Sequence, residues 1–142
     1  MVARMRHIAL CVPDPEKSAQ MFEHAFGMKR VGNAPAGVYM TDGVVNVALL
    51  SYPNGIPGFP PGEKFYGVTH FGMWVDDLEE TKKKVEEVGC NHLMGGGDHT
   101  PGVYYEVKYT DPNGIVFDLT HSGWRGAVKE VVPAEAKAEA AE

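Results

Sequence analysis

The sequence has few cysteines, no long apolar run and no excess of positive charge. Its two cysteines, Cys11 and Cys90, do not form the CxxC spacing of a zinc or redox motif. No apolar segment approaches the about 20 residues that a membrane-spanning helix needs. The chain has 13 basic and 19 acidic residues and a net charge of −6. This balance argues against nucleic-acid binding, because contacts with phosphate need clustered Lys and Arg.

The first residues also lack the succession of charged, apolar and small residues that marks a signal peptide. We therefore expect a cytoplasmic protein with reduced thiols that binds neither a membrane nor a nucleic acid. A chain of 142 residues is long enough for one domain with its own core.

The positive feature that carries most information is a repeat. The segment HIALCVPDPEKS, which starts at His7, returns 63 residues later as HFGMWVDDLEET, which starts at His70. Each copy holds a histidine, an apolar strand, an acidic turn and the start of a helix. Because repeated units usually pack face to face, we expect the two histidines to converge.

The two copies predict two modules of the order β-α-β-β-β, and hence an α+β fold. Module one is expected over residues 5–52, a linker rich in proline and glycine over 53–67, and module two over 68–122. The single domain is expected to cover residues 1–124, and the Ala- and Glu-rich residues 125–142 to form a flexible tail. The predicted strands are 6–12, 28–32, 37–40, 44–52, 68–75, 91–94, 103–110 and 115–121, and the predicted helices are 15–26 and about 77–88.

The last predicted strand carries a carboxylate on its polar face. Side chains alternate along a strand, so Asp118 faces away from Phe117 and Leu119. If the modules pair about a pseudo-twofold axis, Asp118 and the two repeated histidines face one shared concave sheet. That set is a two-His-one-carboxylate facial triad, which leaves three adjacent positions open on a divalent metal. The module-one counterpart of Asp118 is Ala48, so a fourth ligand is not expected, although Asn46 on the same face is a weak stand-in.

These features resemble the vicinal oxygen chelate superfamily, which includes glyoxalase I, extradiol dioxygenases, methylmalonyl-CoA epimerase, fosfomycin-resistance enzymes and bleomycin-binding proteins. The resemblance covers residues 5–122 and rests on RHIALCVPDPEKSAQMFEHAFGMKRVG, THFGMWVDDLEE and YTDPNGIVFDLTH. It implies two paired βαβββ modules that form a curved mixed sheet around one cavity. It also implies metal ligands at His7, His70 and Asp118, where most members have glutamate at the last position.

A finer resemblance links the second module to extradiol dioxygenases. The sequence pattern of extradiol dioxygenases matches this chain at Gly97-Asp98-His99, at Val107, at the turn DPNG and at Asp118. Lys108 stands where that pattern has a tyrosine. The resemblance implies that His99 is an acid or base near the substrate and that Lys108 contacts an oxyanion or a substrate carboxylate.

Further polar residues are predicted to line the cavity. Glu106 shares the inward face of its predicted strand with Lys108, and we expect these two residues and His99 to be catalytic. The expected substrate contacts are Tyr39, the module-one equivalent of Lys108, together with Tyr104, His121 and Trp124, of which the last two follow the final strand and are expected to close the cavity.

Three functions remain open from the sequence. The first, which the sequence favours, is ring cleavage of a catechol-type compound that binds Fe(II), the favoured ion, through two oxygens while dioxygen takes the remaining position. The second is isomerisation, epimerisation or lyase chemistry with Mn(II), Co(II), Ni(II) or Zn(II), through an enediolate that the metal stabilises. The third is sequestration of a ligand or antibiotic without turnover. The resemblance also implies a homodimer, in which the site lies within one chain or between two.

Overall fold

The computed structural model describes residues 2–97 and 104–132. Its helices are α1 (Pro15–Phe26) and α2 (Leu78–Glu87). Its strands are β1 (Arg4–Cys11), β2 (Lys29–Ala34), β3 (Gly37–Thr41), β4 (Asn46–Leu50), β5 (Gly67–Trp74), β6 (Asn91–Gly95), β7 (Val107–Thr110) and β8 (Val116–Thr120). Neither helix is long and apolar enough to cross a membrane.

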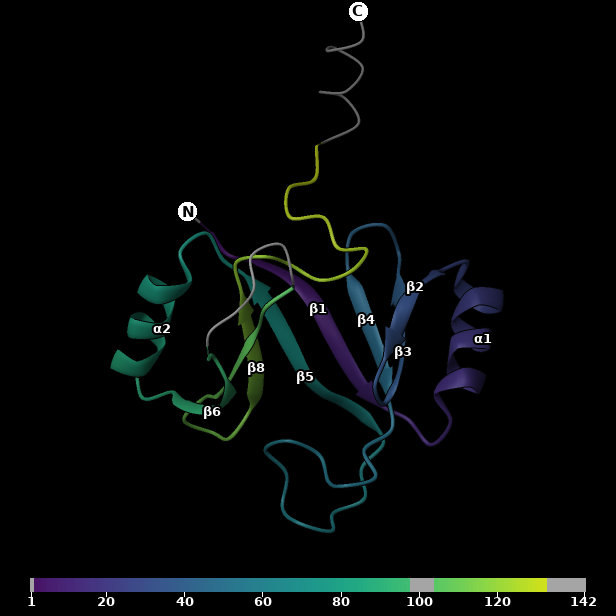
Figure 1. Cartoon of the computed structure of the whole chain (residues 1–142), viewed down its shortest axis with the longest axis horizontal. Coiled ribbons are helices and arrows are strands. Elements are labelled where there is room, and N and C mark those ends of the chain that lie inside the picture. Colours follow the sequence, from purple (N-terminus) through teal and green to yellow (C-terminus); the bar gives the residue numbers. More distant parts are fainter. Residues whose placement is uncertain (1, 98–103, 133–142) are drawn as a thin grey trace, which may run out of the picture.

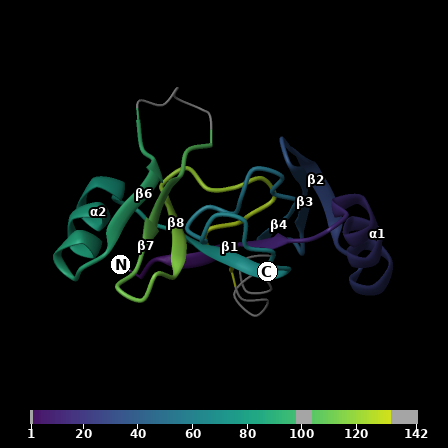
Figure 2. The same ribbon diagram turned by 90° about the horizontal axis from the view of Figure 1, so that it is seen from below.

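The strands form one mixed sheet whose order is symmetric about its central pair. The order is β2-β3-β4-β1-β5-β8-β7-β6, so each module contributes one half. Strands β1 and β5 pair antiparallel in the centre, and each also pairs in parallel with the last strand of its own module. The sheet curves, and the two helices lie on its outside at opposite ends (Figures 1 and 2). The predicted fold of two βαβββ modules in one sheet is confirmed.

The repeat in the sequence includes the caps of the two helices. The side chain of Asp14 accepts a hydrogen bond from the backbone N–H of Lys17, and that of Asp77 accepts one from Glu80. Each such cap stabilises its helix by about 1 kcal/mol. Helix α1 ends at Phe26 and is capped by Gly27, whose φ of 65° lies in the left-handed region that glycine adopts without a steric cost.

Two apolar clusters hold the helices against the outer face of the sheet. The buried cluster between α1 and the sheet consists of Ala19, Val38, Met40, Val47 and Leu49. The buried cluster between α2 and the sheet consists of Val75, Leu78, Val107, Tyr109, Phe117 and Leu119. Because strand residues alternate between faces, the residues between these positions point to the concave face. The polar residues predicted to bind a metal are among them.

The structure differs from the prediction at the start of β7. This strand begins at Val107 rather than at residue 103, so Tyr104 and Glu106 precede it. The backbone of Tyr105 bonds to side-chain hydroxyls instead of a neighbouring strand, because its N–H donates to Ser122 Oγ and its carbonyl accepts from Thr120 Oγ1. These bonds replace the ladder that the alternating sequence pattern predicted.

Residues 121–130 run across the sheet after β8 and bond to both modules. The carbonyl of Gly126 accepts a hydrogen bond from Thr41 Oγ1, and the N–H of Val128 donates to the carbonyl of Val44. Lys129 pairs with Asp76 in module two. The sequence predicted a flexible tail from residue 125, whereas these contacts attach residues 125–130 to the domain. We call residues 121–130 the C-terminal strap.

Candidate metal centre

Three potential ligands from distant strands meet on the concave face. His7 lies on β1, His70 on β5 and Asp118 on β8, and all three side chains are buried. Their nearest coordinating atoms are 3.3 Å apart between the two Nε2 atoms, 3.2 Å from His70 Nε2 to Asp118 Oδ2, and 3.6 Å from His7 Nε2 to the same oxygen. One ligand atom from each residue lies within 4.8 Å of the others. The convergence that the repeat predicted is therefore present.

Cross-strand register explains this convergence. His7 lies opposite Asn46 on one side and opposite Gly72 on the other, and Gly72 lies opposite Asp118. A Cβ at residue 72 would lie 2.6 Å from the ring of Trp124 and 2.8 Å from the Cβ of His7. The absence of a side chain at Gly72 therefore makes room for the indole beside His7.

The carboxylate of Asp118 has one satisfied and one unsatisfied oxygen. Its Oδ1 accepts a hydrogen bond of 2.9 Å from Lys108 Nζ. Its Oδ2 is buried and has no hydrogen-bond partner among the described residues. A buried oxygen without a partner is destabilising, so this atom fits a position beside a cation. Despite burial, the pKa of Asp118 is lowered to about 2, because of His70, Lys108 and His7.

His7 is held in the form that binds metals. Burial lowers its pKa to about 4, although Asp118 acts in the opposite direction, so its ring is neutral at pH 7. The side-chain amide of Asn46 donates to the carbonyl of Arg125 (2.8 Å), and its Oδ1 lies 2.7 Å from His7 Nδ1. That oxygen can only accept, so the proton is on Nδ1 and the lone pair of Nε2 faces Asp118.

His70 is oriented in a similar but weaker way. The hydroxyl of Thr69 donates to the carbonyl of Ala9 and lies 3.3 Å from His70 Nδ1. It can accept the proton of Nδ1, which again leaves Nε2 for a metal. The three residues therefore fit a divalent ion in ligand type and in the atoms that they present.

A cavity of about 360 Å³ opens beside these residues. Its lining includes His7, His70 and Trp124, together with Glu106, Lys108 and Met94 from module two and Tyr39, Ala48 and Leu50 from module one. This volume is at the lower end of the range for small-molecule sites.

Glu106, Lys108 and Trp124 form a connected polar group in the cavity. The indole N–H of Trp124 donates to Glu106 Oε2 at 2.7 Å, and Lys108 Nζ donates to Glu106 Oε1 at 3.2 Å. Burial and the nearby Asp118 raise the pKa of Glu106. Burial opposes the charge on Lys108, but the two carboxylates keep its pKa above the ordinary value. Trp124 also stacks on the ring of His7, with centroids 4.8 Å apart.

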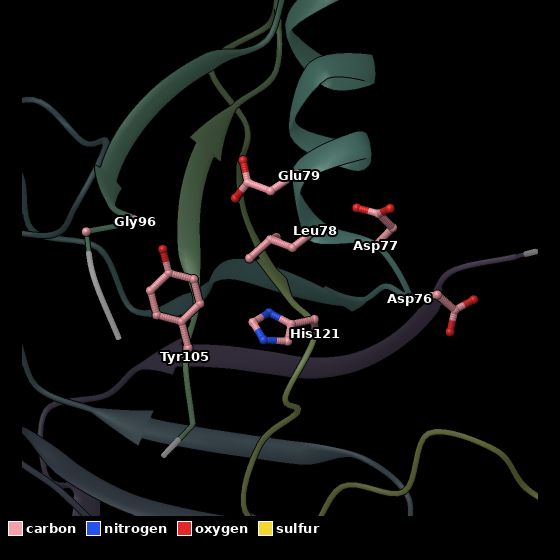
Figure 3. A pocket seen from close by; sticks show the side chains of 8 residues that line it. Asp76, Asp77, Leu78, Glu79, Gly96, Tyr105 and His121 are labelled. Atoms are coloured by element: carbon pink, nitrogen blue, oxygen red, sulfur yellow. The ribbon is translucent and has the colours of Figure 1, made fainter. Parts of the chain in front are cut away.

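Other predicted site residues lie elsewhere. His121 is on the outer side with α2, where it lines a separate hollow of about 700 Å³ with Leu78, Glu79 and Tyr105 (Figure 3). The prediction that it closes the cavity is therefore corrected, since His121 follows the alternation of Leu119 rather than that of Asp118. Tyr104 is 54% exposed and does not line the cavity. His99 lies outside the described residues.

Two residues that contribute to the centre had little or no signal in the sequence. The sequence predicts Asn46 only as a weak substitute ligand, but it bonds to the candidate ligand His7. Gly72 carries no chemical group that marks it in the sequence, although it stands two positions after the predicted ligand His70. Both positions could have been found by pairing the predicted strands residue by residue.

Comparison with known proteins agrees with this fold. Residues 4–119 match the Glyoxalase/Bleomycin resistance protein/Dioxygenase superfamily. The Mn(II)-bound glyoxalase from Novosphingobium aromaticivorans is similar, with a TM-score of 0.62 and 18% identity over 92% of this chain and 44% of that chain. A variant of Streptomyces coelicolor methylmalonyl-CoA epimerase in complex with 2-nitronate-propionyl-CoA has a TM-score of 0.65 and 14% identity, over 84% of this chain and 97% of that one.

A third similar structure is the 2,3-dioxygenase LapB from Pseudomonas sp. KL28, with a TM-score of 0.62 and 17% identity over 92% of this chain and 45% of that chain. This chain thus spans less than half the length of the glyoxalase and dioxygenase chains. At such identities these structures show a shared fold alone, whereas the family match covers most of the sequence. The chain belongs to the Glyoxalase/Bleomycin resistance protein/Dioxygenase superfamily.

Proposed function

We propose that the protein is a metal-dependent enzyme whose small substrate binds the ion through neighbouring oxygens. The observation that carries this proposal is the buried Oδ2 of Asp118, which has no hydrogen-bond partner among the described residues and forms a triangle with the Nε2 atoms of His70 and His7, at 3.2 Å and 3.6 Å. A divalent ion held by His7, His70 and Asp118 would supply Lewis acidity to the substrate oxygens. Three protein ligands leave coordination positions for a substrate, as in a catalytic rather than a closed structural site.

Within this class, the geometry favours proton transfer at a carbon next to a carbonyl. Glu106 lies in the same cavity, and its raised pKa is closer to the value that suits a general base near pH 7. Its carboxylate would take the proton from carbon, while the C–H electron pair moves toward the carbonyl oxygen. Return of that proton to another position or face completes an isomerisation or epimerisation. Lys108 would stabilise the negative charge on oxygen.

Ring cleavage of a catechol-type compound with Fe(II) and dioxygen is the second candidate. The facial set of three ligands supports it, since two open positions can receive the substrate and the third dioxygen. Lys108 provides a point charge where the resemblance places a tyrosine hydroxyl, which weakens this candidate relative to proton transfer. Sequestration without turnover is disfavoured by the presence of a complete ligand set.

Metal loading tests the shared part of the proposal. The protein is loaded anaerobically with Fe(II), Mn(II), Co(II), Ni(II) or Zn(II), and the bound ion is counted by mass spectrometry. We expect one ion per chain, and its loss in His70→Ala but not in the control His24→Ala, which removes an exposed histidine on α1. Failure of every ion to bind would contradict the proposal.

A second measurement separates the two reactions. With metal-loaded protein in D₂O, proton NMR follows exchange of the C3 protons of 2-oxobutanoate. Oxygen uptake is measured in parallel with a panel of catechols. Exchange that Glu106→Gln abolishes without metal loss supports proton transfer, whereas oxygen uptake with a ring-fission chromophore and no exchange supports the dioxygenase instead.

A further inference from the structure

An arginine of the C-terminal strap lies on the concave face of module one. Its Nη1 lies 2.7 Å, and its Cδ 3.1 Å, from the position that a Cβ at Gly32 would occupy, and this arginine is Arg125. Gly32 on β2 lies opposite Tyr39 on β3, and residues that lie opposite each other on paired strands point to the same face of the sheet. Tyr39 lines the cavity beside the metal centre. The guanidinium of Arg125 therefore lies next to the module-one side of that cavity.

The backbone of the strap holds Arg125 in this place. Its carbonyl accepts a hydrogen bond of 2.8 Å from Nδ2 of Asn46, the residue that also bonds to His7. The carbonyl of the next residue, Gly126, accepts a hydrogen bond from Thr41 Oγ1. The strap crosses the sheet from β8 to module one (Figure 1), so these bonds fix the start of the arginine side chain relative to the candidate ligands.

The guanidinium of Arg125 has no anionic partner. The residue is exposed, and its side chain forms no ion pair or hydrogen bond with any residue that the structure describes. Lys108, a cation in the lining of the cavity, already contacts Asp118 at 2.9 Å and Glu106 at 3.2 Å. A second anionic group of a substrate would therefore pair with Arg125 rather than with Lys108, whose charge is already balanced by two carboxylates.

The hydroxyl of Tyr39 is a second donor at this place. Burial and Glu106 raise the pKa of Tyr39, while Arg125 acts in the opposite direction, so the guanidinium lies near enough to the hydroxyl to affect its charge. The hydroxyl is protonated at pH 7 and makes no hydrogen bond within residues 2–97 and 104–132. A guanidinium offers parallel N–H groups to the two oxygens of a carboxylate, and the hydroxyl can donate a further hydrogen bond to it.

We infer that Arg125 and Tyr39 bind a second carboxylate of the substrate, at the opposite end from the oxygens that chelate the metal. This inference rests on the proposed function, because the chelating end needs the metal. Strands β3 and β4 lie between β2 and β1, which carries His7, so the backbones of β2 and β1 are roughly 14 Å apart along the sheet. The two ends of the substrate are therefore joined by a chain of several carbons, as in a 2-oxo dicarboxylate.

Ligand binding to Co(II)-loaded protein tests the inference without turnover. The visible absorption of the bound Co(II) is titrated with pairs of ligands that have equal numbers of carbons and differ only in a methyl group or a carboxylate at the far end. The pairs are 2-oxopentanoate and 2-oxoglutarate, 2-oxohexanoate and 2-oxoadipate, and 2-oxoheptanoate and 2-oxopimelate. In at least one pair the dicarboxylate should bind at least about fivefold more tightly. If no pair shows this preference, the inference is wrong.

Two variants test the residues that bind the second carboxylate. Arg125→Gln removes the guanidinium but keeps the backbone carbonyl that bonds to Asn46. The ratio of dissociation constants within the preferred pair should then fall to less than about twofold, because no fork of N–H donors remains for the carboxylate. Tyr39→Phe keeps the ring and should lower the same ratio by about two- to threefold, because one hydrogen bond is lost.

The matched control is Arg30→Gln, which removes an equal charge from the same strand as Gly32. Arg30 pairs with two glutamates of α1, so its loss should leave the ratio unchanged. A ratio that survives Arg125→Gln, or that falls equally in Arg30→Gln, contradicts the inference.

The titration also separates failure of the inference from failure of the proposed function. If the unaltered protein binds no Co(II), the proposed function fails and the inference fails with it. If Co(II) and the monocarboxylates bind but no dicarboxylate is preferred, only the inference fails.

Discussion

Replacement of Asn46 by leucine should weaken metal binding without removing a ligand. The Asn46 side chain is 1% exposed and makes two hydrogen bonds, of 2.7 Å with His7 Nδ1 and of 2.8 Å with the carbonyl of Arg125. Leucine has a similar size but leaves both partners without a bond. His7 then loses the contact that keeps its proton on Nδ1 and its Nε2 directed at the metal position.

The expected magnitude follows from the loss of this contact. Removal of such a partner of a metal-ligating histidine lowers metal affinity about 10- to 100-fold, which corresponds to about 1.4 to 2.7 kcal/mol. The metal-free protein should also lose about 2 kcal/mol of unfolding free energy, since two buried hydrogen bonds are removed.

Competition with a chromophoric chelator measures the affinity for Zn(II), and urea unfolding measures the stability of the metal-free protein. The matched control is Asn33→Leu, which makes the same change at an exposed position of β2 and should alter neither quantity appreciably. If folded Asn46→Leu protein binds Zn(II) as tightly as the unaltered protein, our account of how His7 is oriented is wrong.

Three further predictions concern the same centre. The metal-free protein should lose stability as the pH falls from about 6.5 toward 4, because the pKa of His7 is lowered to about 4 in the folded state and the unfolded chain takes up the proton more readily. The expected loss of unfolding free energy is on the order of 3 kcal/mol. Urea unfolding at several pH values measures it, and His7→Leu should lack most of this pH dependence. Trp124→Phe keeps an aromatic ring against His7 but removes the N–H that bonds to Glu106. Proton exchange of 2-oxobutanoate should therefore slow about tenfold, while the affinity for Zn(II) changes less than twofold. Equal losses of exchange rate and of Zn(II) affinity would contradict the view that the N–H of Trp124 acts on Glu106 and not on metal binding. Gly72→Ala should displace the Trp124 indole and lower the unfolding free energy by about 1 to 3 kcal/mol. A lower urea midpoint and altered tryptophan fluorescence measure these effects. An unchanged midpoint would show that the indole is not closely packed against residue 72.

Local features of the sequence were sufficient for the modules, the helices and the three candidate ligands. Asp14 and Asp77 mark the helix starts because each side chain accepts a hydrogen bond from a backbone N–H three residues later. Alternation along β8 places the side chains of Asp118 and Phe117 on opposite faces of the sheet. The repeat then relates the two histidines. The caps and the alternation depend on residues that are near neighbours in the chain, and the repeat is a pattern of the sequence itself, so the sequence alone determines these inferences.

The surroundings of the ligands depended on the tertiary structure. Asn46 meets His7 because β4 pairs with β1, and Trp124 reaches the same ring because Gly72 leaves space and the C-terminal strap crosses the sheet. The strand predicted from residue 103 begins only at Val107, since hydroxyl groups beyond β7 bond to the backbone of Tyr105.

The sequence by itself therefore determined which residues are candidate metal ligands, and the tertiary structure decided which groups orient them. The physical reason is that caps and alternation act over a few residues, whereas register, ring stacking and the strap join positions from 39 residues apart, as for His7 and Asn46, to 117 residues apart, as for His7 and Trp124.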